Sequence, residues 1–201
     1  HKVVIEEFLQ GEEASFICLC DGATAIPFAS SQDHKARDDG DKGPNTGGMG
    51  AYSPAPVVTA EVHENVMRQV IEPTLAGMAK DGMPYVGFLY AGLMIDAEGQ
   101  PKVIEFNCRF GDPEAQPVMM RLQSDLLQAC QAAVAGRLAE SQLHFDPRVA
   151  LGVVMAAGGY PQQYDRGDVI SGLDKELADT KIFHAGTRMQ DGEVVLSLIH
   201  I

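Results

Sequence analysis

Three polar residues at alternating positions form the first candidate site, within residues 103–109. Glu105 and Asn107 stand two apart in an apolar run that reads as a strand, so their side chains point to the same face. A carboxylate beside an amide carbonyl offers hard oxygen donors, which suit Mg²⁺ or Mn²⁺ carrying nucleotide phosphates. Arg109 would place a phosphate-binding guanidinium next to that metal if the strand continued. A strand with a solvated polar face remains the simpler explanation of the Glu–Asn pair taken alone.

A second candidate lies in residues 30–56, where Gly, Pro, Asp and Asn replace the apolar periodicity. We expect a long loop there, functional or mobile. Lys35 and Arg37 supply cations, and the glycines of residues 43–50 would let backbone N–H groups converge on an anion. The segment is not a P-loop, because no Gly-Lys-Ser/Thr ends it. The aspartates at positions 38, 39 and 41 equally fit a flexible surface loop.

The third candidate is the acidic segment at residues 6–13, after an expected strand at residues 3–8. Phe8 and Leu9 could cover a flat base while their backbone groups bond to its edge, and Glu13 could bind sugar hydroxyls. Composition alone fits an acidic turn between strands better.

The elements that must position these residues alternate between strands and helices. An Asp-Gly pair at positions 21–22 predicts a hairpin of residues 14–20 and 23–29. A helix should follow Thr59 and kink or end at Pro73. Strands are expected at residues 85–95 and 102–107, a helix at 123–136, and short strands at 149–157, 169–172 and 181–185. This order predicts an α+β fold with an antiparallel sheet and a domain boundary near residue 145.

Composition excludes several classes of partner. The 201 residues carry 15 basic and 28 acidic side chains, a formal net charge of −13, so nucleic acid and anionic membrane surfaces would repel the chain. The sequence contains no run of about 18 apolar residues, so no transmembrane helix is expected. Cys18 and Cys20 share one strand face and are poor disulfide partners. Reduced thiols and a cytoplasmic location are therefore expected.

Several motifs, in this order and spacing, resemble one enzyme family. They occupy residues 5–13, 31–35, 43–54, 104–114 and 152–161. The chain resembles the phosphoribosylamine–glycine ligase (glycinamide ribonucleotide synthetase) family of ATP-grasp enzymes. The resemblance implies the second half of an ATP-grasp domain at residues 1–145, followed by the start of a small β-rich C-terminal domain at 146–195.

The resemblance also implies a role for each candidate residue. Glu6 and the backbone near Phe8 and Leu9 would hold adenine, and Glu13 the ribose of ATP. Glu105 and Asn107 would bind the divalent metal, and Arg109 would stabilise the transferring phosphoryl group or the acyl phosphate. The residues expected to bind glycine and phosphoribosylamine are Asp33, Lys35, Asn45, Thr46, Gly47, Gly48, Met49, Gly50 and Asp112.

The implied reaction is ATP-dependent ligation of glycine to 5-phosphoribosylamine through a glycyl phosphate. The products are glycinamide ribonucleotide, ADP and phosphate, in de novo purine (IMP) synthesis. Another ATP-grasp carboxylate–amine ligase and a non-catalytic nucleotide-binding module are the alternatives.

The sequence departs from the family pattern in three places. The family's first ATP-grasp half has no counterpart, so we expect a fragment that turns over poorly alone. Residues 91–94 carry no acid that could serve as a second metal ligand. Residues 196–201 do not continue the pattern, and we expect them to be a non-native tail.

Overall fold

The computed structural model describes residues 3–175 and 177–196. These residues fall into two compact units. One unit holds the chain up to Asp33 and residues 50–152, and the other holds residues 34–49 and the chain from Val153 onward. Each unit is described by itself below. Most of the expected tail, residues 197–201, lies outside the described residues.

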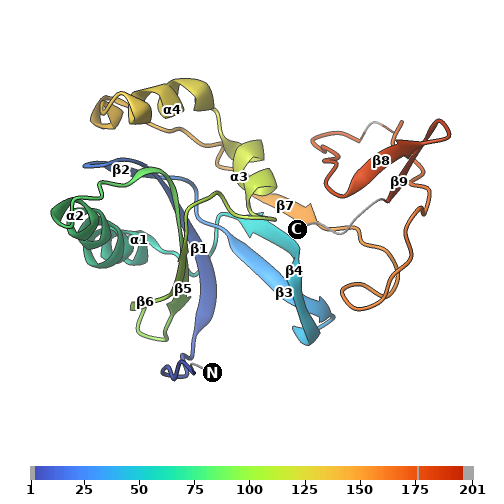
Figure 1. Ribbon diagram of the computed structural model, residues 1–201, viewed down its shortest axis with the longest axis horizontal. Coiled ribbons are helices and arrows are strands. Elements are labelled where there is room, and N and C mark those ends of the chain that lie inside the picture. Colours follow the sequence, from blue (N-terminus) through green and yellow to red (C-terminus); the bar gives the residue numbers. More distant parts are fainter. Residues whose placement is uncertain (1–2, 176, 197–201) are drawn as a thin grey trace. The chain divides into compact units, whose positions relative to one another are not determined.

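The first unit is built on a four-stranded antiparallel sheet, in the order β2-β1-β5-β6 (Figure 1). Its strands are β1 (Glu12–Asp21), β2 (Ala25–Pro27), β5 (Val86–Ile95) and β6 (Pro101–Asn107). Asp21 closes the β1–β2 turn, because its Oδ1 accepts the N–H groups of Ala23 at 3.1 Å and Thr24 at 2.7 Å. The hairpin and the strand pair expected at residues 85–107 are confirmed.

One continuous helical path packs on the first face of this sheet. It consists of α1 (Ala60–Val66), a π-helical turn η1 (Met67–Ile71) and α2 (Glu72–Lys80). Thr59 starts it by accepting the N–H of Val62 through Oγ1 at 3.2 Å, as predicted. The path does not end at Pro73. The wider π turn ends at Ile71, two residues before the proline, which lacks the N–H of a regular helical bond.

Strand β1 is buried on both faces, which explains why its residues 14–20 are apolar apart from Ser15. Phe16 and Cys18 pack among the residues of α1, η1 and α2, whereas Ile17 and Leu19 pack among those of α3 (Ala115–Arg121) and α4 (Leu126–Val134). The helix expected at residues 123–136 is therefore present but begins at Leu126, after Asp125, whose side chain accepts the N–H of Gln128. A short 3₁₀ turn, η2 (Leu138–Glu140), follows it.

The thiols in this core are reduced. All four cysteines are free, with Cys18 and Cys20 buried. Burial raises the pKa of Cys20 to about 12, so this thiol stays protonated and behaves as a small apolar side chain.

The prediction of a long loop at residues 30–56 is wrong. Residues there form β3 (Gln32–Asp38) and β4 (Lys42–Ser53), which belong to a three-stranded sheet with β7 (Ala150–Val153) in the order β3-β4-β7. The connecting turn has positive φ at Gly40 (74°) and Asp41 (58°). The ladder is made by backbone groups, so polar and glycine-rich residues join it without any apolar alternation.

The prediction of a strand at residues 3–8 is also wrong. Residues 3–10 are irregular, and Val3, Val4 and Ile5 are exposed. A strand needs a neighbour for its backbone groups, and the described residues provide none for this segment. The segment joins β1 through Gly11, where a Cβ would meet the carbonyl oxygen of Ile95.

The second unit contains a hairpin of β8 (Thr187–Gln190) and β9 (Glu193–Leu196). It turns at Asp191 and Gly192, both at positive φ. The strand expected at residues 181–185 is wrong, because that segment is irregular, and Val169 forms only an isolated bridge to Val195. The Asp-Gly pair marks the true hairpin six residues later. In the described part of the chain, no helix is long and apolar enough to cross a membrane.

Candidate functional site

Glu105 and Asn107 lie on the outer strand of the sheet, side by side. In β6 they stand opposite Gly92 and Tyr90 of β5. The Nδ2 group of Asn107 donates a hydrogen bond of 3.0 Å to Oε1 of Glu105, which confirms that both side chains share one face. This bond leaves Oε2 of Glu105 and Oδ1 of Asn107 as acceptors for a ligand.

The two open oxygens fit a magnesium ion that carries nucleotide phosphates. Mg²⁺ is usually bound through one or two carboxylates, while water and substrate phosphates complete its octahedron. Among the described residues no group of three or more His, Cys, Asp or Glu side chains could hold a metal ion. The Glu–Asn pair therefore matches an ion shared with a substrate better than an ion enclosed by protein.

Gly92 makes room for this pair. A Cβ at Gly92 would lie 3.3 Å from Cγ of Glu105 and 3.3 Å from Cε1 of Tyr90, tighter than ordinary van der Waals contact. A larger residue at this position would push the carboxylate or the ring aside. Because Gly92 has no side chain, Glu105 and the Tyr90 ring can both pack closely against its backbone.

Arg109 lies on the same face, held by an aromatic ring. Strand β6 ends at Asn107, so the strand alternation that predicted the direction of Arg109 does not reach it. Instead, the guanidinium carbon lies 5.8 Å from the centre of the Tyr90 ring, within cation–π range. Nη1 donates to the carbonyl oxygen of Phe110 at 2.9 Å. The remaining N–H groups can bind an anion beside Asn107.

Beside these residues, on the inner strands of the same sheet, lies a buried polar network that the sequence analysis did not assign to the site. Ser15 Oγ donates to Oε1 of Glu114 at 2.7 Å and lies 3.0 Å from the hydroxyl of Tyr90. Glu114 is 2% exposed, and its Oε2 has no hydrogen-bond partner among the described residues. Its one sequence signal is Ser15, a polar residue inside an otherwise apolar buried run.

The network alters the titration of its members. Burial raises the pKa of Glu114, and the nearby charge of Asp33 raises it further, against the hydrogen bond from Ser15. Burial also raises the pKa of Tyr90, with the charge of Glu114 adding to it. Both groups therefore resist ionisation, since a charge in this layer has lost its water.

Comparison with known proteins decides the family. Residues 1–115 match the family model described as "Phosphoribosylglycinamide synthetase, ATP-grasp (A) domain", and residues 150–197 match the model of its C domain. The chain belongs to the phosphoribosylglycinamide synthetase family. The family and the ATP-grasp fold expected from the motifs are thereby confirmed.

Full-length relatives of this synthetase-family chain are about twice as long. It is 65% identical over 197 residues to phosphoribosylamine–glycine ligase of Allochromatium vinosum, covering 98% of this chain and 46% of that protein. The Escherichia coli ligase is 63% identical over 198 residues, again with 46% of its length covered. The chain thus spans about half the length of the curated relatives it matches.

Solved structures agree with this assignment. The crystal structure of phosphoribosylamine–glycine ligase from Thermotoga maritima is 34% identical, with a TM-score of 0.83 over 96% of this chain and 47% of that one. The biotin carboxylase of Campylobacter jejuni is 14% identical, with a TM-score of 0.61 over 82% of this chain and 34% of that one. At that identity it shares the fold alone.

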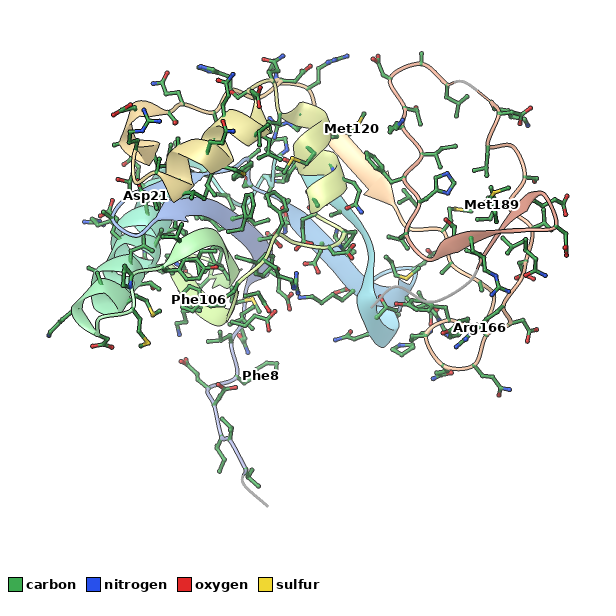
Figure 2. All side chains as sticks on the ribbon, turned by 45° about the horizontal axis from the view of Figure 1, so that its top comes forward. Phe8, Asp21, Phe106, Met120, Arg166 and Met189 are labelled. Atoms are coloured by element: carbon green, nitrogen blue, oxygen red, sulfur yellow. The ribbon has the colours of Figure 1, made fainter. Side chains whose placement is uncertain are left out.

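The residues expected to bind adenine and ribose lie before strand β1 and at its start in the synthetase-family fold. Glu6, Phe8 and Leu9 belong to the irregular segment before β1, where Phe8 is 87% exposed (Figure 2). Glu13 is the second residue of β1. An ion pair of 3.0 Å between Glu7 and Lys102 joins the segment to β6. The adenine and ribose assignments stay predictions.

The expected substrate residues divide between the two units. Asp33, Gly50 and Asp112 belong to the first unit, where the charge of Asp33 reaches Glu114 and Tyr90. Lys35 and the five residues 45–49 belong to the second unit. Their role in binding substrate stays a prediction.

The glycine-rich strand does not form the expected anion nest. Gly47 donates its N–H to the hydroxyl of Tyr160 at 3.2 Å, and Gly48 donates to Oγ1 of Thr46 at 3.0 Å. Thr46 Oγ1 itself donates to the carbonyl oxygen of Lys35 at 2.8 Å. The expectation fails because these residues lie in strand β4, and a strand does not aim successive amides at one point.

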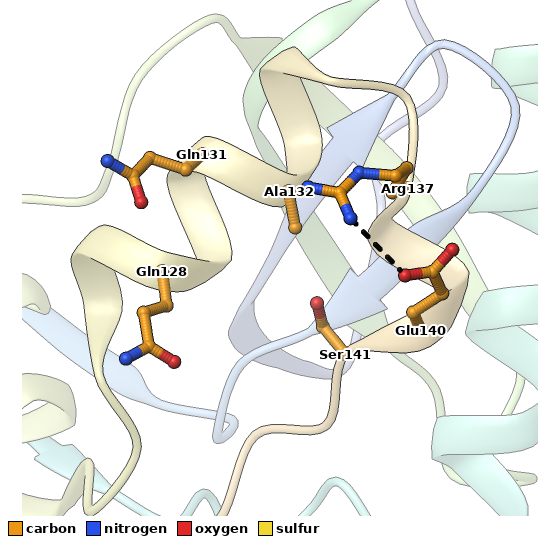
Figure 3. Close-up of a pocket in the computed structure, with 6 residues that line it drawn as sticks. All are labelled: Gln128, Gln131, Ala132, Arg137, Glu140 and Ser141. Carbon is orange, nitrogen blue, oxygen red and sulfur yellow. Dashed lines mark ion pairs between the residues drawn. The ribbon is translucent and has the colours of Figure 1, made fainter.

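A shallow polar pocket lies against α4 and η2 (Figure 3). Arg137 and Glu140 form an exposed ion pair there, with 3.6 Å between Nη1 and Oε2. The pocket contains no residue that the sequence assigned to the site.

Proposed function

We propose that this chain supplies the metal- and phosphoryl-binding half of a ligase that joins glycine to 5-phosphoribosylamine. One observation carries the proposal: Glu105, Asn107 and Arg109 gather on one face of the sheet, in a chain 65% identical to a phosphoribosylamine–glycine ligase. Because the chain spans 46% of that relative, the complete reaction requires the remaining part of the enzyme.

The proposed reaction has two steps, which together form a carbon–nitrogen bond at the expense of ATP. A carboxylate oxygen of glycine attacks the γ-phosphorus of ATP, giving glycyl phosphate and ADP. The amine of phosphoribosylamine then attacks the acyl carbon, loses a proton and expels phosphate. Glycinamide ribonucleotide, an intermediate on the route to IMP, is the product.

Glu105 Oε2 and Asn107 Oδ1 would hold Mg²⁺ or Mn²⁺. The bound ion supplies neutralisation of the charge on the ATP phosphates. Arg109 places its unused N–H groups where negative charge develops on the transferring phosphoryl oxygens and on the acyl phosphate. Such preorganised donors stabilise phosphoryl transfer without a strong base.

The remaining assignments complete the proposal. Glu6, Phe8 and Leu9 hold adenine, and Glu13 holds the ribose. Asp33, Lys35, Asp112 and residues 45–50 bind glycine and phosphoribosylamine. In a chain of net charge −13, local cations such as Lys35 are needed to bind a phosphorylated substrate. The four free thiols agree with work in the reducing cytoplasm.

A chimera tests this function directly. This chain replaces its matched segment in the Allochromatium vinosum ligase, and ADP release and product mass are measured with and without each substrate. We expect turnover that requires both glycine and phosphoribosylamine, and poor turnover from the 201-residue chain alone. A folded chimera that forms no glycinamide ribonucleotide would contradict the proposal. Full rates from the chain alone would contradict its dependence on the missing half.

A further inference from the structure

A chain of buried contacts connects helix α3 to the ring beneath Arg109. Glu114 precedes the first residue of α3, Ser15 lies in β1 and Tyr90 in β5. Ser15 donates to Glu114 at 2.7 Å, so the hydroxyl of Tyr90 donates to Ser15 across 3.0 Å. The Tyr90 ring in turn supports the guanidinium at 5.8 Å. Three separate elements are thereby tied to one exposed cation.

The chemistry of this network is costly for a purely structural contact. A carboxyl group removed from water loses its hydration, and Oε2 of Glu114 gains no hydrogen bond in return among the described residues. A well-packed apolar side chain would fill such a space at lower cost. The polar group therefore does something that apolar packing would not do.

Two glycines shape the space around the network. A Cβ at Gly111 would lie 2.7 Å from Cδ of Glu114, and one at Gly92 would lie 3.3 Å from Cε1 of Tyr90. Glu114 and the tyrosine ring are thus held closely on the sides where these glycines stand. Fixing the ring fixes the surface on which the guanidinium rests.

We propose that Glu114 is a positioning residue, which acts through Ser15 and Tyr90 to hold Arg109 in its phosphoryl-binding orientation. The hydroxyl tether prevents the Tyr90 ring from tilting, and the ring restricts the guanidinium to the face that carries Asn107. The catalytic consequence rests on the proposed ligase function, whereas the tether itself does not.

The tether is tested by NMR on the 201-residue chain with isotope-labelled arginine. Side-chain protons of Arg109 lie over an aromatic ring, so ring current shifts them upfield of their position in the Tyr90→Leu variant. We expect Glu114→Ala to move these signals toward the Tyr90→Leu position and Glu114→Gln to restore them, because its amide oxygen still accepts from Ser15. Unchanged Arg109 signals in Glu114→Ala would overturn the tether.

The catalytic consequence is tested by a double-mutant cycle in the chimera. We expect Glu114→Ala to lower kcat about tenfold while KM for ATP changes less than about twofold. In an Arg109→Ala background the same substitution should have almost no further effect, because it acts through Arg109. Equal losses in both backgrounds would show a general structural role and overturn the proposal.

A milder variant and a control variant support both the NMR test and the kinetic test. Tyr90→Phe removes only the hydroxyl and should give the same pattern with a smaller loss, even if Glu114→Ala folds poorly. Glu140→Gln changes an exposed carboxylate of the α4 pocket and should leave both readouts unchanged. A chimera that is inactive in its unaltered form contradicts the ligase function alone, and the NMR signals still decide the tether.

Discussion

Residues at the edge of the sheet, here called the outer layer, differ sharply in exposure from their neighbours on the inner strands, here called the inner layer. Strand β6 is exposed or half-buried along its length, and Glu105, Asn107 and Arg109 lie on it or directly after it. Ser15 and Tyr90 on the inner strands β1 and β5, and Glu114, which bonds to Ser15, form the inner layer and are all buried. The outer residues keep free oxygens and N–H groups for ligands, whereas the inner residues bond to one another through Ser15 and leave only Oε2 of Glu114 without a partner among the described residues.

The outer layer is therefore suited to binding ligands, and the inner layer to holding the outer residues in position. The outer layer can exchange water for a metal ion or phosphate without disturbing the core. The inner layer cannot change without affecting the fold, because its polar groups depend on each other for hydrogen bonds. Substitutions in the outer layer should therefore change rate or affinity alone, and those in the inner layer should change stability as well.

The largest expected effect is on catalysis, from the outer layer. Arg109→Ala should lower kcat of the chimera about 10²–10³-fold, because a preorganised donor to the transferring phosphoryl group is lost. The free energy of unfolding should stay within about 0.5 kcal/mol, as for other surface substitutions. Steady-state kinetics and urea unfolding measure the two quantities. The matched control, Arg137→Ala, breaks only an exposed ion pair and should change neither.

The next effect is on stability, from the inner layer. Ser15→Ala should destabilise the chain by about 1–3 kcal/mol, because it leaves the buried carboxyl of Glu114 and the Tyr90 hydroxyl without their partner. Urea unfolding of the 201-residue chain measures this loss. Ser141→Ala, at the α4 pocket (Figure 3), should be nearly neutral. Equal values for the two variants would erase the contrast between the layers.

The smallest effect is a change in pH dependence. The raised pKa of Glu114, caused first by burial, means that this carboxyl binds more protons in the folded chain than in the unfolded chain between its unfolded pKa, about 4.3, and its higher folded pKa. Its contribution to stability is therefore present at low pH and lost as pH rises through the folded pKa. Glu114→Gln has no titrating carboxyl at this position and therefore lacks this pH-dependent contribution. The free energy of unfolding of the unaltered chain, relative to that of the variant, should fall with rising pH. Urea midpoints from pH 4 to 8 measure it, and a pH-independent difference would contradict it.

The sequence predicted the parts of the fold whose signals are local. The apolar runs of β1 and β5 and the Asp21-Gly22 turn define the central sheet, and Thr59 marks a helix start. The spacing of Glu105 and Asn107 likewise predicted their shared face. Each of these inferences depends on neighbours in the chain, so one sequence was enough.

The misses have two physical causes. Strands β3 and β4 lack apolar alternation, because backbone hydrogen bonds rather than buried side chains define them. The Ser15–Tyr90–Glu114 network joins residues 75 and 99 positions apart, and no local spacing records such contacts. Arg109 combines both cases: its place was predicted from strand alternation, but an aromatic ring from another strand holds it there.

The central claim is that Glu105 and Asn107 bind a divalent ion carrying the phosphates of ATP. Its most direct test is calorimetric titration of the chimera with ATP, in the presence of Mg²⁺ and after its removal by EDTA. We predict that Glu105→Ala weakens Mg²⁺-dependent ATP binding about tenfold or more, that Asn107→Ala weakens it similarly, and that Glu98→Ala, in the exposed turn between β5 and β6, does not. Unchanged Mg²⁺-dependent binding in Glu105→Ala would contradict the account.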